Sequence, residues 1–570
     1  MRKHLLSLSS IRHFLTTILW FTLHEISAAQ TRPTTQQFIA ELGCASCHVD
    51  LSIESNLKNL IPNLSHAGLR YNPAYLFDYL QHPTKIRRHL GRARMPDFHF
   101  SEKEALALTL FLETQKKEIP DLPAFPAELS APLHERKRIT SKEKFRVIIG
   151  DSLICISCHT FEGKGDTSAV GLETFGYRFQ AEWLKKFLIT PNAFDVPLEI
   201  MPALFYNLSP DKRKFIELMP RPAESINRLT DYLFSLTAEK RTKLEKAFVR
   251  AKAADPDVSI ETGRRIFLAQ NCLACHQHNT MQQWRNDAAP DLRAEGIRVQ
   301  KEWLEEFLKN PKPIRPFGYH PGSGSRMPDF KLTDDEAKII GDFLFEQKRG
   351  ANALTQAFKP AKLSVFSMNK AKALLGEKLA CIGCHRLGET GGRIGPDLSN
   401  ISNRLQPAFV FNVIKNPRVV LPHTVMPQVP MPPKTAELIA NFLMQAKHQQ
   451  TDSPYLSLVE NPITLFDEKI QPKGDYQKYC APCHGEAGDG RGHNARFLPR
   501  KPAVHADAGY MSTRPDDTLF DGISAGGAIL NKSHFMPPWG QTLSNSEMNQ
   551  LVNYLRDLCK CQGPEWSRDN

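Results

Sequence analysis

Several features that would assign a chain of 570 residues to a familiar class are missing from this sequence. No apolar run reaches the ~20 residues that a membrane-spanning helix needs. No glycine-rich nucleotide loop and no acyl-transfer triad is found. Apolar residues (41%) and charged residues (24%) have ordinary shares for a soluble globular protein, and the length is too great for one core. The sequence therefore predicts several domains.

The first thirty residues have the composition of a secretory signal. A positive start at residues 2–3 is followed by a short apolar segment at 14–23 and small residues at 27–29. An uncleaved membrane anchor is the alternative, although the apolar segment is short for a span. We expect residues 1–29 to be removed, which leaves a periplasmic or otherwise exported chain without a membrane span in an oxidising compartment.

The cysteines carry the clearest chemical pattern. Ten of the twelve fall into five Cys-x-x-Cys-His motifs, whose first cysteines lie roughly 100 residues apart. This is the attachment signature of c-type haem, because two thiols one turn apart can add to the vinyl groups of one porphyrin and the histidine can bind its iron. Zinc sites and dithiols use similar pairs, but five copies in an exported chain favour haem. The motifs contain Cys44, Cys47 and His48; Cys155, Cys158 and His159; Cys272, Cys275 and His276; Cys381, Cys384 and His385; and Cys480, Cys483 and His484.

One plan recurs after the first four motifs, as an internal repeat. Each repeat ends in a proline 21 positions after its first residue and has an arginine at the same offset. A solvated residue at a helix start and a partner for a haem propionate are both compatible with this arginine. The four arginines are Arg70, Arg178, Arg298 and Arg404.

A Met-Pro pair follows in every unit, in a loop ahead of a terminal helix. The first and third units share the tetrapeptide Met-Pro-Asp-Phe, at residues 95–98 and 327–330. Capping boxes predict where three of the terminal helices begin: Ser101 with Glu104, Thr333 with Glu336, and Ser544 with Glu547. The Met-Pro methionines are Met95, Met201, Met327, Met426 and Met536.

A helix that ends in Cys-x-x-Cys-His, followed by a loop, a helix, a Met-Pro loop and a last helix, resembles class I cytochrome c. The likeness covers nearly the whole mature chain, and the fifth unit is similar to small cytochrome c modules attached to bacterial oxidases and dehydrogenases. The resemblance implies an all-α fold of five tandem small helical domains and five covalently bound haem c groups. It also implies the motif histidine as proximal ligand and the Met-Pro methionine as distal ligand. The expected division is a signal peptide at 1–29 and domains at 30–128, 136–250, 256–350, 362–450 and 462–565.

The distal methionine of the second unit stays open between Met201 and Met219. In the fourth unit Met426 is preferred, because it lies 17 residues before Leu443, an interval that the first and third units share. The first mature unit has Met95 alone. The methionines set aside on spacing or context are Met281, Met431 and Met511.

The sequence favours an electron carrier over an enzyme, because His/Met ligation fills both axial positions of the iron. Two alternatives remain: a peroxidase-like haem enzyme with one open haem, for which the second unit is the candidate, and an electron-accepting subunit of a dehydrogenase or oxidase complex. The expected partners are redox proteins, with donor and acceptor not identified. The net charge of +12 is largely offset by signal removal and roughly ten propionate charges, so it indicates neither nucleic acid nor an acidic membrane.

Two cysteines lie outside the motifs, Cys559 and Cys561. With the other ten thiols consumed, each is the only intrachain partner for the other. A disulfide between them, an intermolecular link and idle thiols all remain open.

Overall fold

The structure is a computed structural model of the chain. It describes residues 34–48, 61–86, 94–118, 122–130, 155–191, 194, 201–282, 289–324, 326–447, 454–461 and 471–568. The expected signal peptide lies outside these ranges. Within them, none of the helices combines the length and apolarity that a bilayer span requires. The described residues are mostly helical, with three two-stranded hairpins, so the predicted all-α class is confirmed.

The helices and strands follow the repeat closely. The elements up to residue 254 are α2 (Thr35–Leu42), α4 (Ala67–Arg70), α5 (Pro73–Gln81), α6 (Glu102–Glu113), β1 (Thr160–Phe161), β2 (Lys164–Gly165), α8 (Phe175–Arg178), α9 (Ala181–Ile189), β3 (Tyr206–Leu208), β4 (Phe215–Glu217), α10 (Pro222–Leu236) and α11 (Ala238–Ala254). Those up to residue 377 are α12 (Ile260–Ala269), α13 (Glu295–Arg298), α14 (Lys301–Lys309), α15 (Asp334–Phe345) and α16 (Val365–Glu377).

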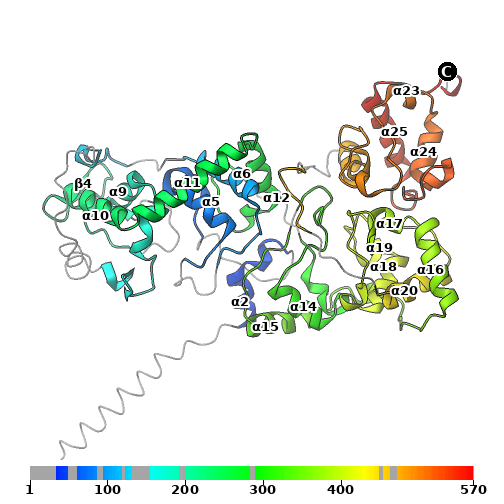
Figure 1. The fold of residues 1–570 in the computed structure, drawn as a ribbon, viewed down its shortest axis with the longest axis horizontal. Coiled ribbons are helices and arrows are strands. Elements are labelled where there is room, and N and C mark those ends of the chain that lie inside the picture. The colour runs from blue at the N-terminus through cyan, green and yellow to red at the C-terminus, as the bar shows by residue number, and fades with distance from the viewer. Residues whose placement is uncertain are drawn as a thin grey trace, which may run out of the picture.

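The last two units complete this series. Their elements are α17 (Cys381–Cys384), β5 (Arg386–Leu387), β6 (Thr390–Gly391), α18 (Pro407–Lys415), α19 (Pro417–Val420), α20 (Pro433–Gln445), α21 (Lys473–Asp475), α22 (Ala481–His484), α23 (Ala508–Met511), α24 (Asp516–Ala525) and α25 (Asn545–Cys559). In Figure 1, α9 and α10 lie at one end of the molecule and α24 and α25 at the other, whereas α5 and α6, which come earlier in the chain than α9, lie between them.

Capping explains where the terminal helices begin. At α6, α15 and α25 the side chain of the N-cap residue accepts a hydrogen bond from the N3 backbone, and the N3 glutamate accepts one from the N-cap backbone. Both halves of each predicted capping box are thus present, and the three predictions are confirmed. These boxes satisfy backbone donors that would otherwise lack partners in the first turn.

Helix α11 occupies a charged stretch that the sequence suggests as a separator between units. Leu244, Phe248 and Ala251 are buried on one of its faces, at spacings of four and three residues. The ring of Phe248 lies 5.6 Å from that of Phe77 on α5. Three apolar positions therefore suffice to pack a mostly polar helix against the neighbouring unit.

The helix before the third motif packs on the first unit. Helix α12 crosses α6 so closely that a Cβ on Gly263 would stand 1.9 Å from the carbonyl oxygen of Ala107. Beside this crossing the rings of Phe111 and Phe267 lie 5.2 Å apart. Only glycine allows two helix backbones to approach to this extent.

The helix before the first motif makes the reciprocal contact. Figure 1 shows α2 beside α14 and α15, two helices that come much later in the chain. Its three buried residues share one core cluster with α14 and α15. We call residues 61–118 the first body and residues 289–350 the third body. Each body is packed against the motif helix that the sequence places before the other. The shared cluster is formed by Phe38, Ile39, Leu42, Leu292, Val299, Leu304, Leu308, Ala337, Ile340 and Leu344.

The two Met-Pro-Asp-Phe loops join these bodies about a pseudo-twofold axis. The backbone amide of Asp97 donates to the carbonyl of Asp329 at 2.8 Å, and the reverse bond measures 2.7 Å. Two ion pairs repeat the symmetry, Arg94 with Glu336 at 3.0 Å and Arg326 with Glu104 at 2.9 Å. The shared tetrapeptide therefore has a structural role in pairing the two bodies, besides carrying a methionine.

Candidate haem-attachment sites

The five motif histidines share one hydrogen bond. In each, Nδ1 lies within 3.1 Å of a backbone carbonyl oxygen. A carbonyl can only accept, so Nδ1 carries the proton and Nε2 keeps its lone pair for a metal. The pairs are His48 with Pro290, His159 with Val170, His276 with Pro62, His385 with Pro396, and His484 with Ala503.

Two of these pairs cross between units. His48 bonds to Pro290 at 2.7 Å and His276 bonds to Pro62 at 3.1 Å, whereas the other three histidines bond within their own unit. The crossing agrees with the packing of α2 and α12. The first motif is therefore completed by the third body, and the third motif by the first body.

The ten motif cysteines are not joined in disulfides. Burial raises the pKa of Cys44, Cys272 and Cys480 to about 12, so these thiols are held in their neutral form. Among the described residues, no cluster of three or more His, Cys, Asp or Glu side chains is placed to hold a metal ion.

One continuous cavity of about 1410 Å³ joins the first, fourth and fifth motifs. That volume exceeds the about 300–1,000 Å³ of a typical single-ligand site, as expected if several large ligands share it. Its wall includes the methionines that the sequence selects for the third, fourth and fifth units. The wall residues in question are Cys44, Cys47, His48, Cys381, Cys384, His385, Cys480, Cys483, His484, Met327, Met426 and Met536.

Three arginines line the same cavity where the third body meets the fourth unit. Burial, together with the charges of Arg315 and Arg298, lowers the pKa of Arg404 to about 9. Burial also lowers the pKa of Arg315. Arg298 is paired with Glu295. The other half-buried cations of the cluster are costly unless anions neutralise them, and haem propionates are anions of suitable size and charge. The cavity, the histidine geometry and this arginine cluster therefore all fit haem.

The predicted distal methionines lie near their expected surroundings. Met95, Met201 and Met219 all pack on one core cluster that runs through the first body and the second unit, and Cys155 and Cys272 pack on the same cluster. The choice between Met201 and Met219 therefore stays open. Met431 packs against Phe411, Ala436 and Ala440, and Met511 is 1% exposed within the core of the fifth unit. Both also line the cavity that Met426 and Met536 line, so the choice of distal methionine in these two units stays a prediction.

Sequence reasoning noticed the repeated arginines but missed the amide side chain two residues after each. The Arg-x-Gln or Arg-x-Asn tripeptides pair as antiparallel bridges, Tyr71 with Phe179 and Val299 with Leu405. The amide of Gln406 donates to Gly296 and Val299 backbone oxygens at 3.0 and 2.9 Å. An Asn or Gln follows each repeated arginine by two residues, so this pattern can be found in the sequence.

Two further residues carry no sequence signal. Arg315 reaches the arginine cluster from the loop after α14. The ring of His505 stacks on that of His484, with centroids 4.0 Å apart, and its Nδ1 lies 3.0 Å from the Tyr476 hydroxyl. His505 thereby holds the plane of the motif histidine in the fifth unit.

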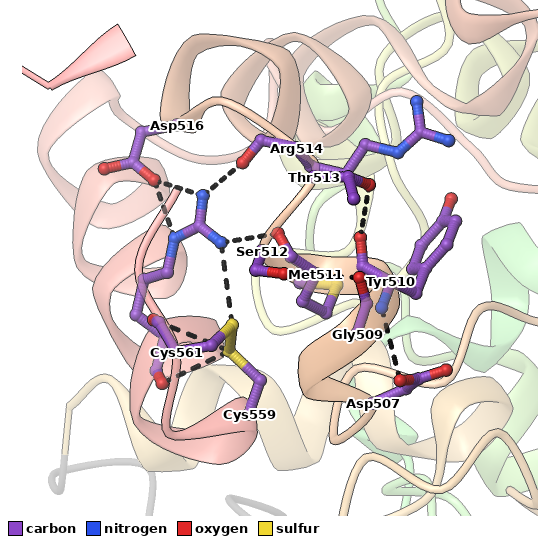
Figure 2. Close-up of a disulfide and its surroundings, with 11 residues drawn as sticks. Asp507, Gly509, Tyr510, Met511, Ser512, Thr513, Arg514, Asp516, Cys559 and Cys561 are labelled. Atoms are coloured by element: carbon purple, nitrogen blue, oxygen red, sulfur yellow. Dashed lines mark hydrogen bonds and ion pairs between the residues drawn. A yellow bond between two sulfur atoms is a disulfide. The ribbon is translucent and has the colours of Figure 1, made fainter. Parts of the chain in front are cut away.

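The remaining cysteines pair with each other. Figure 2 shows Cys559 and Cys561 joined in a disulfide at the end of α25. The guanidinium of Arg556 bridges this end of the helix to the carbonyl of Met511 at 2.8 Å and to Asp516. Of the three alternatives, the structure has the intrachain disulfide. The contact between the last helix and the loop before α24 is made by Arg556, which donates to the carbonyls of Met511 and Arg514.

Comparisons with known proteins agree with this chemistry. The family model described as "Cytochrome c" matches residues 260–347. The model described as "Cytochrome C oxidase, cbb3-type, subunit III" matches residues 468–555. No curated protein and no solved structure matches the chain. The two matches support a c-type cytochrome whose domains bind haem covalently and transfer electrons.

Proposed function

We propose that the chain is an exported pentahaem c-type cytochrome that transfers electrons between redox partners through five His/Met-ligated haems. The observation that carries this proposal is the recurrence of one histidine geometry at all five motifs. The family matches cover two of the five units, and the same local geometry at the other three extends the assignment to them.

The proposed roles follow from the residues. The ten motif cysteines would hold the porphyrins, and the motif histidines would bind iron through Nε2. Met95, Met201, Met327, Met426 and Met536 would be the distal ligands. A bound haem c supplies reversible one-electron chemistry at iron, and methionine ligation raises its reduction potential. Arg298, Arg315 and Arg404 would neutralise propionates and exclude water from the cavity, which lowers the reorganisation that accompanies a charge change.

The test is haem stoichiometry. The full chain, expressed with a haem-attachment system, should carry five haems per polypeptide that resist acid–acetone extraction, as counted by pyridine haemochrome and intact mass. A mature N-terminus at or near Gln30 should be found in the same mass measurement. Fewer than five haems per chain in fully matured protein contradicts the proposal.

A second candidate is a fixed subunit of a respiratory complex. The match of residues 468–555 to an oxidase subunit model favours it for the fifth unit. The large exposed hydrophobics among the described residues are scattered over several units, with pairs at residues 216–218 and 365–366. Purification from native membranes and periplasm distinguishes the two, since a subunit remains with its complex and a free carrier does not.

A further inference from the structure

Two kinds of contact alternate between the units. At the first kind, arginine-bearing turns pair as antiparallel bridges. The backbone N–H of Asn72 donates to the carbonyl of Arg178 at 2.9 Å, and the backbone N–H of Gln180 donates to the carbonyl of Arg70 at 3.0 Å. These bonds join the first body to the second unit. The third body and the fourth unit are joined in the same way. The backbone N–H of Gln300 donates to the carbonyl of Arg404 at 2.8 Å, and that of Gln406 to the carbonyl of Arg298 at 2.9 Å.

At the second kind of contact, two Cys-x-x-Cys-His motifs meet. The amide of Asn271 donates to Cys47 Sγ at 3.7 Å, which brings the third motif against the first. Nearby, the Ser46 hydroxyl bonds to the Cys275 thiol. The first and third motifs are thus adjacent, although 228 residues of sequence separate their first cysteines.

The fourth and fifth motifs meet in the same way. Asn494 donates from Nδ2 to the Gly383 carbonyl at 2.8 Å and to Cys483 Sγ at 3.4 Å. A Cβ on Gly383 would stand 2.2 Å from the Phe535 carbonyl oxygen, so the two units touch at the motif itself. Gly383 is the only glycine at this position among the five motifs.

From these contacts we infer that the haems form one linear series in the order second, third, first, fourth, fifth, because the first and third units exchange their attachment segments. The haem on Cys44 and Cys47 lies in the third body with Met327 as distal ligand, and that on Cys272 and Cys275 lies in the first body with Met95. This inference rests on the proposed function. It places arginine-type and motif-type contacts in strict alternation along the series.

Packing supports the exchanged ligand pair. Cys44 and Phe330, which ends the Met-Pro-Asp-Phe tetrapeptide of the third body, both pack on the core cluster shared by α2, α14 and α15, and His48 and Met327 line one cavity. Met95 and Cys272 both pack on the core that is built on α5, α6 and α12 and continues into the second unit. Transfer along the series moves one electron per step, so that one centre is oxidised as the next is reduced, with no bond made or broken. The second and fifth units stand at the two ends of this series.

Hydrogen exchange on the five-haem chain tests the exchange of segments. Phe111→Leu removes ring contact with Phe267, and it should raise amide exchange in residues 260–269 about fivefold while leaving 35–42 unchanged. The matched variant Phe343→Leu, at the equivalent position of α15, should do the reverse. A response of 35–42 to Phe111→Leu, or equal responses of both helices to both variants, overturns the inference.

Ligand pairing gives a second, spectroscopic test. Met327→Ala should remove about one-fifth of the weak far-red charge-transfer absorption of ferric His/Met haem, a feature expected from the family resemblance. In a four-haem background carrying Cys44→Ala and Cys47→Ala, the same change should remove none of the remainder, whereas Met95→Ala should remove about one-quarter. The opposite pattern overturns the exchanged pairing. If the four-haem protein does not accumulate, the hydrogen-exchange measurement on the Phe111 and Phe343 variants decides whether the two segments are exchanged. Failure of the proposed function is distinct, because it shows as fewer than five haems in the unsubstituted chain.

Discussion

The two pseudo-symmetric ion pairs between the first and third bodies should differ greatly in energy. The Arg326 and Glu104 side chains are 4% and 2% exposed, whereas those of Arg94 and Glu336 are 16% and 15% exposed. Residues 454–461 cause part of this difference, since Leu456 and Leu458 bond to the first pair and Tyr455 stacks on its guanidinium. Burial of one pair and partial hydration of the other gives a matched comparison within one molecule.

Arg326→Met leaves the carboxylate of Glu104 buried without its cation, which costs about 3–5 kcal/mol. Arg94→Met removes a half-hydrated pair and costs about 1 kcal/mol. With a urea m-value of about 1–3 kcal/mol/M, the first change should lower the local unfolding midpoint by about 1–5 M and the second by about 0.3–1 M. Because a chain of several domains does not unfold in two states, the midpoint is best measured by hydrogen exchange of the α6 and α15 amides.

The double variant Glu104→Gln with Arg326→Met tests the cause. It strands no charge, so it should recover part of the loss of Arg326→Met. Retention of five haems in every variant, measured by pyridine haemochrome, controls for faulty maturation. Equal midpoints for Arg326→Met and Arg94→Met would refute the argument from burial.

Three further predictions concern the fourth and fifth units. Gly383→Ala should loosen the contact between these two units, because the added Cβ meets the Phe535 backbone. Amide hydrogen exchange at 491–497 should become faster while haem attachment persists, and unchanged exchange there contradicts the close approach. Met426→Ala should remove about one-fifth of the His/Met absorption, whereas Met431→Ala should cost about 2 kcal/mol of stability and remove none, because Met431 fills a core. Burial, with Arg496 and Arg393 nearby, lowers the pKa of His493 to about 4. The stability that the fifth unit gains from neutral His493 is therefore complete above pH 6.5 and is lost as the pH falls toward 4. His493→Phe, which keeps the stack on Phe317, should flatten this dependence of exchange in the fifth unit, and an unaltered pH profile counts against it.

Much of the local structure could be predicted from sequence because it depends on neighbours in the chain. The capping boxes at Ser101, Thr333 and Ser544 need only a side chain three residues away. The preference for Met426 over Met431 rests on spacing within one unit, and that for Met536 over Met511 on the proline that follows it; both stay predictions. Such features are decided by short-range geometry, and the repeat displays them several times over.

The partners of α2 and α12 could not be predicted in this way. Both helices present a pair of large apolar residues, Phe38 with Ile39 and Ile266 with Phe267, to similar faces of α15 and α6. The apolar pattern of each helix fits both bodies. This pattern therefore does not determine whether α2 packs on the first or the third body, and the same holds for α12. The choice depends on contacts between distant residues, such as the Asn271 amide at Cys47 and the ladder of Asp97 with Asp329.

The exchange of segments has a consequence for how the molecule holds together. On the proposed function, a haem bonded through Cys272 and Cys275 would be enclosed by the first body and would link two parts of the chain. A haem on Cys44 and Cys47 would link the same two bodies in the opposite sense. Together with the buried Arg326–Glu104 pair, these two crossings oppose separation of the first body from the third, because parting them would expose both cores. The middle of the series is thus its most firmly joined point, although its two attachment motifs are far apart in the sequence.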